Sequence, residues 1–461
     1  METSDNQMEH QSNVARLSDT TLHDWYRMVY AYSDQIIYDL AEEWGMTEDD
    51  LLLDPFVGTG TTAVAAKTIG IDAIGADASP IAVLASRAKT TWDVDIAALR
   101  TTAEELIETV EPVFNEIGSQ DNTMLSSFDD EEPESVDLDI YDLEKPDKTP
   151  KDWLSEKPRQ KMLVLRHHVE ELASADDVDE DVVDLIRLAM CAIMPEDVGN
   201  VGFGPEAYKT KVKEDVPVLQ YFENKVEKMA SDLQTIQTRI DDGDKTSGET
   251  EIVDADARVI GNKLTADSEL LASHGSVDYV ITSPPYPAEH DYTRNQRLEL
   301  VWLGVLEDNS DLQTIKKRNI RSNTKNIYVD DDDGEQLNIR DNDRIDTIVT
   351  RMEQIIEEEE ISHGFGQYYP RVVEEYFAGM QRHLQQVYDI MSPGGKAGYV
   401  VADSGSYWQV DIPTGTILGE LAEERIGFEE IGIKHWRDLQ ATTGKKDTQN
   451  EEILILEKPA E

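Results

Sequence analysis

The run Thr282-Ser283-Pro284-Pro285-Tyr286 is the part of this chain best suited to chemistry. It follows an apolar stretch typical of a strand, residues 277–281. Proline fixes φ and has no N–H, so the carbonyls here are rigid acceptors. The serine hydroxyl is a further acceptor, and the tyrosine offers a flat face for stacking. Such groups could hold a planar ring with an exocyclic amino group, and this chemistry suits methylation of a base extruded from a nucleic acid.

A second group of residues, far upstream, is suited to holding a nucleotide-like ligand. Residues 51–63 (LLLDPFVGTGTTA) predict a buried strand, a glycine turn with the spacing G-x-G-x-x-A, and the start of a helix. A second strand, residues 72–77, ends at Asp77, where an acid can bind ribose hydroxyls. A Walker A loop is excluded because no Gly-Lys-Thr/Ser follows at the required spacing.

These two motifs together resemble the amino-group DNA methyltransferases, which make N4-methylcytosine or N6-methyladenine from S-adenosylmethionine. The resemblance covers most of the chain. Residues 23–26 (HDWY) and 32–35 (YSDQ) resemble the segment that helps to hold the methionine end of the cofactor, and residues 392–396 (SPGGK) resemble the turn into the fifth strand. The cofactor is therefore expected to contact Asp54, Phe56, Gly58, Gly60, Thr61, Asp77, Ala78 and Asn262.

The resemblance implies a class I methyltransferase fold, a Rossmann-like, doubly wound sheet of seven strands. The third strand is expected at residues 257–262, where Asn262 stands in the place of the acid that contacts adenine in related enzymes. The last strands are expected near residues 398–402, 431–436 and 452–456, and helices at 34–44, 61–67, 79–89 and 372–391. A helical insertion at 157–240 falls between the second and third strands, which does not match the simplest arrangements of the family.

Three regions follow from this pattern. Residues 1–100 form the first half of the cofactor-binding domain, behind a flexible tail that ends near residue 18. Residues 101–250 hold an acidic linker and the insertion, a candidate target-recognition module. Residues 251–461 form the catalytic half, in which the polar and irregular segment 305–365 could read DNA. The acidic run at 330–334 is not an EF-hand loop, because Val329 and Arg340 would occupy ligand positions 1 and 12.

The expected reaction is direct methyl transfer, with no metal. The serine hydroxyl and the Pro284 carbonyl would accept both N–H groups of the target amine, and Tyr286 would stack on the flipped base. Serine at the head of the motif favours cytosine N4 in the related enzymes, with adenine N6 the alternative. Cys191 has no Pro-Cys context, which argues against C5-cytosine methylation. A tRNA guanine-N2 methyltransferase and a non-catalytic nucleic-acid-binding regulator remain open.

The composition is strongly acidic for a nucleic-acid enzyme. The chain of 461 residues has 42 Lys plus Arg and 96 Asp plus Glu, a net charge of −54. Because the acids are spread along periodic segments, we expect a salt-adapted, halophilic globular protein in which high salt screens the self-repulsion. High salt also weakens counterion release, so DNA binding should rest more on base contacts and local basic clusters. The candidate DNA contacts are Tyr292, Arg294, Arg297, Lys316, Lys317, Arg318, Arg321, Lys209, Lys211 and Lys213.

The remaining expectations concern the setting of the protein. Cys191 is the single cysteine, so no disulfide can form within the chain, which suits a reducing cytoplasm. No signal peptide or apolar run of membrane-spanning length is present. The expected partner is double-stranded DNA, with a separate restriction endonuclease as a second candidate. The oligomeric state stays open.

Overall fold

A computed structural model describes residues 22–28, 32–119, 138–175, 177–204, 206–243, 247–288, 290–328, 336–405, 407–439 and 449–460. The expected N-terminal tail, most of the expected linker and the acidic run at 330–334 lie outside these residues. No helix within the described ranges is long and apolar enough to cross a membrane.

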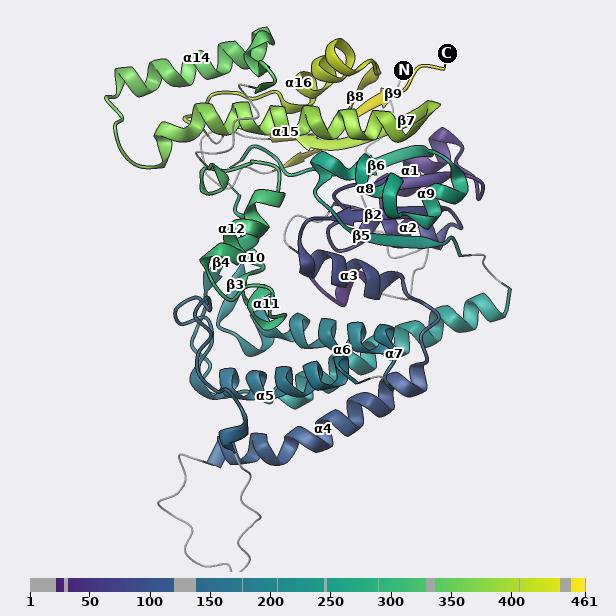
Figure 1. Ribbon diagram of the computed structural model, residues 1–461, viewed down its shortest axis with the longest axis vertical. Coiled ribbons are helices and arrows are strands. Elements are labelled where there is room, and N and C mark those ends of the chain that lie inside the picture. The colour runs from purple at the N-terminus through teal and green to yellow at the C-terminus, as the bar shows by residue number, and fades with distance from the viewer. Residues whose placement is uncertain are drawn as a thin grey trace, which may run out of the picture.

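A seven-stranded sheet forms the centre of the fold (Figure 1). Its order is β5-β2-β1-β6-β7-β9-β8; the first five strands run parallel, and β9 is antiparallel to both of its neighbours. This is the class I methyltransferase sheet expected from the sequence. The strands are β1 Leu51–Asp54, β2 Asp72–Asp77, β5 Thr250–Asp254, β6 Val277–Thr282, β7 Met391–Ala402, β8 Glu429–Leu439 and β9 Gln449–Glu457.

Helices cover both faces of the sheet, because successive side chains of each strand point to opposite faces. Leu51 and Leu53 pack into one core with α8, α15 and α16, whereas Leu52 packs into another with α1 and α2. The helices of this part are α1 Gln35–Trp44, α2 Thr61–Thr68, α3 Pro80–Thr90, α8 Ile260–Asp267, α9 Glu269–His274, α10 Tyr292–Asn295, α11 Arg297–Trp302, α12 Asn309–Arg318, α14 Asp343–Glu358, α15 Tyr369–Ile390 and α16 Thr414–Leu421.

The insertion between β2 and β5 is a layer of long helices below the sheet, with α3 between the two (Figure 1). It comprises α4 Ile96–Ser119, α5 Glu156–Ala173, α6 Glu180–Ile193, α7 Val218–Asp241 and a hairpin of β3 Val201–Phe203 and β4 Ala207–Lys209. Its core is continuous with α3, α11 and α12, since buried side chains such as Leu84 and Trp302 belong to it. Cys191 lies fully buried in this core, in α6.

Two expectations about elements were wrong, and one helix was missed. The third strand lies at Thr250–Asp254, and residues 257–267 are helical because Asp256 accepts a hydrogen bond from the N–H of Arg258 and starts a turn. Segment 305–365 is largely helical: a capping box at Asp308 begins α12, and Asn342 caps α14. Helix α4 was not expected, although it carries buried apolar side chains along its length.

Candidate functional site

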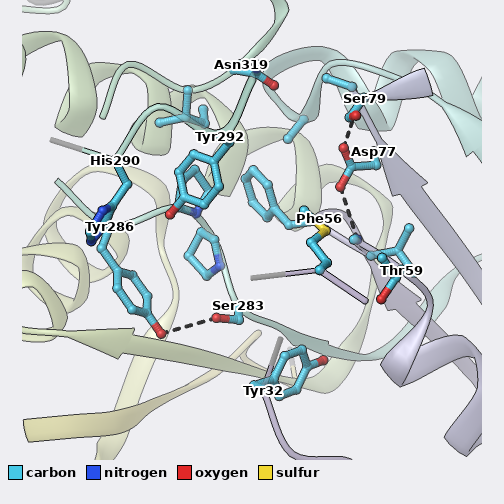
Figure 2. Close-up of a pocket in the computed structure, with 18 of the residues that line it drawn as sticks. Tyr32, Phe56, Thr59, Asp77, Ser79, Ser283, Tyr286, His290, Tyr292 and Asn319 are labelled. Atoms are coloured by element: carbon cyan, nitrogen blue, oxygen red, sulfur yellow. Dashed lines mark hydrogen bonds between the residues drawn. The ribbon is translucent and has the colours of Figure 1, made fainter. Parts of the chain in front are cut away.

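The carboxyl ends of β1, β2, β6 and β7 surround one cavity of about 570 Å³. Parallel strands present their carboxyl ends at the same edge of a sheet, which is where ligands bind in open α/β folds. The glycine turn after β1 and the Ser-Pro-Pro-Tyr run after β6 both line this cavity, although more than 200 residues separate them in the sequence. In Figure 2, Asp77 and Ser79 lie on one side, Ser283 and Tyr286 on the other, and Phe56 between them.

The glycine turn is held to the end of β2 through Asp77. The N–H of Gly58 donates to Asp77 Oδ2 at 3.0 Å, and the N–H of Ser79 donates to Asp77 Oδ1 at 2.8 Å. Gly58 adopts φ +54°, a conformation that glycine reaches without strain. Burial raises the pKa of Asp77 to about 6, although the two backbone donors act in the opposite direction. Each carboxylate oxygen keeps a lone pair, so Asp77 can still accept hydroxyl hydrogen bonds from a ligand in the cavity.

Asp54 lies behind the cavity wall and joins four segments. Its Oδ1 accepts from the N–H of Phe56 at 3.0 Å and from the Thr282 hydroxyl at 2.6 Å. Its Oδ2 accepts from the hydroxyls of Tyr32 and Thr62. With four donors on two oxygens, this carboxylate fixes the start of the glycine turn relative to β6. Burial nevertheless raises the pKa of Asp54.

The predicted cofactor residues divide into two groups. Phe56, Gly58, Thr61, Asp77 and Ala78 line the cavity. Asp54 and Gly60 do not, and Asn262 lies exposed on α8, where its N–H donates to the Gln386 side chain. Direct contact of Asn262 with a cofactor was therefore a wrong expectation, which came from placing the third strand too late. The cavity also takes in Met28, Tyr32, Pro55, Val57, Thr59 and Ser79.

All four residues of the Ser283–Tyr286 run line the opposite side of the cavity. Ser283 Oγ lies 3.3 Å from the Tyr286 hydroxyl (Figure 2), and that hydroxyl donates to Glu451 Oε1 at 3.2 Å. Burial, and to a smaller extent the charge of Glu451, raises the pKa of Tyr286 well above its usual value, so the phenol stays protonated. The turn therefore presents one hydroxyl and a fixed aromatic ring to the same space.

Sequence reasoning missed two polar residues of this side, Glu451 and Arg437. Glu451 at the start of β9 and Arg437 on β8 line the cavity, and Arg437 Nε donates to Glu451 Oε2 at 2.5 Å. Asp403, just after β7, also lines it, and its buried Oδ1 has no hydrogen-bond partner among the described residues. One signal was available: Glu451 and Glu452 directly precede the apolar run 453–456, so one of the two acids had to begin a buried strand.

The outer wall of the cavity comes from two segments that close over it. Tyr292, His290 and Asn319 contribute from the segment after β6 (Figure 2), and Gly204 contributes from the β3–β4 hairpin of the insertion. The hairpin is fastened there by Glu206, which pairs with Arg294 at 2.7 Å and with Lys325 at 3.4 Å. The insertion is thus part of the cavity wall.

Two of the predicted DNA contacts are buried. Lys316 is 6% exposed and its Nζ pairs with Asp291 at 2.9 Å, while Arg321 is 2% exposed and donates to the carbonyls of Lys316, Lys317 and Asn319. A buried, paired cation cannot reach a phosphate, so these two expectations were wrong. Burial also lowers the pKa of Arg297, whose Nε is enclosed.

The other basic residues lie nearer the surface, and most are paired within the protein. Arg318 lines the cavity and pairs with Asp254 at the end of β5. Lys209 pairs with Asp152 at 3.1 Å, and Lys213 donates to the backbone carbonyls of Asp197 and Gly199, a few residues beyond α6. The Lys317 ammonium lies over the ring of Tyr328, at 5.0 Å. Lys211 is exposed. The role of these residues toward DNA stays a prediction.

Comparison with known proteins agrees with this geometry. Residues 27–86 match the family model described as DNA methylase, which covers the N6 and N4 enzymes. The chain is 24% identical over 437 residues to the Type II methyltransferase M.BsoBI of Geobacillus stearothermophilus, spanning 90% of this chain and 80% of that protein. It is 30% identical over 154 residues to M.AvaI of Nostoc sp., spanning 33% of this chain and 30% of that one. No solved structure matches significantly.

The match to the family model spans the glycine turn and Asp77. The similarity to M.BsoBI extends over nearly the whole chain, so it also includes the sheet and the Ser283–Tyr286 run. The chain is therefore similar over most of its length to the amino-group DNA methyltransferases, and the fold and the shared cavity agree with a DNA methyltransferase enzyme.

Proposed function

We propose that this enzyme transfers a methyl group from S-adenosylmethionine to the N4 amino group of a cytosine that is flipped out of double-stranded DNA. The observation that supports the proposal best is the shared cavity, in which the Gly58–Asp77 side and the Ser283–Tyr286 side face each other. Serine at position 283 favours cytosine over adenine, as in the related enzymes.

The cofactor side fits the proposed methyl donor. Gly58 and its neighbours form a turn that approaches a ligand closely, Asp77 retains acceptor capacity for ribose hydroxyls, and Phe56 offers an aromatic face in the cavity. When bound, S-adenosylmethionine would supply an electrophilic methyl group on its sulfonium sulfur. Tyr32 and Met28 would enclose its methionine end, on the side of the glycine turn nearest α2.

The base side supplies acceptors for the target amine. The lone pair of an exocyclic amino nitrogen is delocalised into the ring, so the nitrogen is a weak nucleophile. Ser283 Oγ and the Pro284 carbonyl would accept its two N–H groups, which favours a tetrahedral nitrogen and localises the lone pair. The new N–C bond would form as the methyl–sulfur bond breaks, so that the sulfur leaves as a neutral thioether and the methylated nitrogen loses one proton to water. Tyr286 and Tyr292 would hold the base by stacking, at roughly 1–3 kcal/mol for each ring.

The insertion is proposed to recognise the target sequence. Its hairpin reaches the cavity wall through Gly204, so it lies where DNA flanking a flipped base would pass. A Type II relative suggests that the enzyme works beside a restriction endonuclease of the same specificity.

The decisive experiment uses purified protein in high KCl, labelled S-adenosylmethionine and unmethylated DNA, followed by mass spectrometry of the nucleosides. N4-methylcytosine supports the proposal. N6-methyladenine keeps the site and overturns the base assignment. Label in tRNA but not in DNA would transfer the protein to the guanine-N2 enzymes, and cofactor binding without any transfer would favour a regulator. Ser283→Ala should lower kcat at least about 100-fold, since it removes an acceptor used in the transition state.

A further inference from the structure

A chain of hydrogen bonds leads from the proposed catalytic serine to the edge of the sheet. Ser283 Oγ lies 3.3 Å from the Tyr286 hydroxyl, which lies 3.2 Å from Glu451 Oε1. The other carboxylate oxygen, Oε2, accepts from Arg437 Nε at 2.5 Å. Glu451 is 4% exposed and lines the cavity, as Arg437 does. The hydrogen bonds thus run from the end of β6 to two strands, β8 and β9, that begin more than 140 residues later.

The direction of these hydrogen bonds follows from the chemistry of the groups. A carboxylate paired with an arginine can only accept, so the Tyr286 hydroxyl must donate to Glu451. The tyrosine oxygen then has only lone pairs to offer, and the Ser283 hydroxyl donates to it. The serine proton is therefore directed along the turn, and the lone pairs of Ser283 Oγ remain free for the cavity.

This direction matters for the reaction proposed above, on which the inference rests. The target amine brings N–H groups, so the serine must present lone pairs and not its own proton. A freely rotating hydroxyl would point its proton at the amine for part of the time. We propose that Glu451, held by Arg437, is a positioning residue that orients the hydroxyls of Tyr286 and Ser283 so that Ser283 accepts from the target amine.

The sharpest test is Glu451→Gln, which keeps the shape and changes the hydrogen bonding. Arg437 carries only donors, so it would face the amide oxygen of the glutamine, and the amide NH₂ would turn to Tyr286. The tyrosine proton would then point to Ser283 Oγ, and the serine proton would point into the cavity. We expect kcat to fall roughly 10- to 100-fold, as for a misoriented catalytic group. The Kd for S-adenosylmethionine should stay within about twofold of the wild type, because Glu451 lies on the base side of the cavity.

The coupling to Tyr286 separates this role from a general structural one. In Tyr286→Phe the hydrogen bonds between Ser283 and Glu451 are already interrupted. Adding Glu451→Gln to this variant should therefore cause little further loss of kcat, whereas the losses from two independent changes would multiply. Glu457→Gln is the matched control, because it makes the same change on the same strand. Glu457 is the last residue of β9 and lies opposite Glu429 on β8. This control should keep full activity. Thermal unfolding of every variant establishes that it is folded.

The outcomes distinguish the inference from the proposed function. If Ser283→Ala is inactive while Glu451→Gln stays within about twofold of the wild type, the positioning role is wrong and the proposed function stands. Multiplicative losses in the double variant also overturn it. If Ser283→Ala keeps full activity, the proposed use of the serine fails instead. Should Glu451→Gln not fold, Tyr286→Phe alone decides: the inference requires a lower kcat with unchanged cofactor affinity.

Discussion

At the scale of single residues, Asp77 is the group whose protonation bears most directly on the cofactor side. Its carboxylate holds the N–H groups of Gly58 and Ser79 and faces the cavity. Burial places its pKa near pH 6, and the charges of Asp54 and Asp254 act in the same direction. The ionised form is the stronger acceptor for ribose hydroxyls, because protonation turns one carboxylate oxygen into a donor and removes the charge.

Cofactor affinity should therefore fall as the pH drops through the Asp77 pKa of about 6. If only the ionised form binds, Kd rises up to about tenfold for each pH unit below that value. Calorimetric titration of S-adenosylmethionine between pH 5 and 8 measures the effect. Asp77→Asn should bind weakly at every pH in this range, and a wild-type Kd that does not change with pH would contradict the prediction.

The raised pKa of Asp77 also makes the stability of the folded protein depend on pH. The pKa of Asp77 is higher in the folded protein than its ordinary value of 3.8, so the folded state holds the proton more tightly. Asp77 therefore favours folding most below pH 4, and this contribution is lost as the pH rises toward 6. A lower pH should therefore weaken cofactor binding, while the contribution of Asp77 to folding stability does not decrease.

Gly60 gives a second residue-level prediction. It has φ +91°, and a Cβ at this position would lie 3.2 Å from Ser86 Cα on α3. Gly60→Ala should cost about 1–3 kcal/mol in stability, through backbone strain and displacement of α3. Because Gly60 does not line the cavity, the loss should be visible in denaturant unfolding without ligand. Gly118→Ala, in open space, is the control.

The residues that could be predicted from sequence were those whose role depends on the local chain. The turn at Gly58 and the run from Ser283 to Tyr286 carry their geometry in their own composition, through glycine and proline. Lys316 and Arg321 could not be assigned, because a basic residue looks the same in sequence whether it faces solvent or pairs with a buried acid. For Glu451 the sequence indicated only an acid at the start of an apolar strand, and its contact with Tyr286 follows from the pairing of distant strands in the sheet.

At the scale of elements, α12 is positioned by the buried pair between Lys316 and Asp291. Both side chains are less than 10% exposed, and Asp291 also accepts from the Thr293 hydroxyl at 2.6 Å. Although burial acts in the opposite direction, Lys316 keeps the pKa of Asp291 below its usual range. The pair joins α12 to the segment that carries His290 and Tyr292 over the cavity.

Lys316→Ala should therefore destabilise the protein by about 3–5 kcal/mol, because it leaves a buried carboxylate without its partner. The double variant Asp291→Asn with Lys316→Met removes both charges and should recover most of this loss. Chemical denaturation of the two variants measures the difference. Equal destabilisation in both would contradict the pairing argument. A residue that served only to contact DNA would change affinity and leave unfolding unaffected.

The elements that were wrong in the sequence interpretation share a physical cause. The edge strand β5 has only one neighbouring strand, so its sequence TEIVD lacks the continuous apolar run that identified β1 and β6. Helices α12 and α14 are highly charged, and their apolar stripes are narrow. In a chain with so many acids, a polar segment predicts a surface and does not distinguish a helix from a loop.

At the scale of the whole molecule, the net charge of −54 dominates behaviour in solution. Self-repulsion of this size disfavours the compact state at low ionic strength, and molar salt reduces the Debye length to about 3 Å. The melting temperature should rise by several degrees between 0.1 M and 2 M KCl. Sucrose at equal osmolality is the control for general exclusion effects, and a flat or falling melting temperature would contradict the expected salt adaptation.

The place of β5 has a consequence for how the chain is made. β5 pairs with β2, yet it leaves the ribosome only after the whole helical insertion, on the order of ten seconds later at roughly 5–20 residues per second. The insertion in turn shares its core with Leu298 and Trp302, which are synthesised later still. Until α11 emerges, the insertion lacks part of its core, and until β5 emerges, the sheet lacks its edge strand. The nascent chain therefore exposes apolar surface of both parts during this time. Cotranslational protection by chaperones should matter most in that interval.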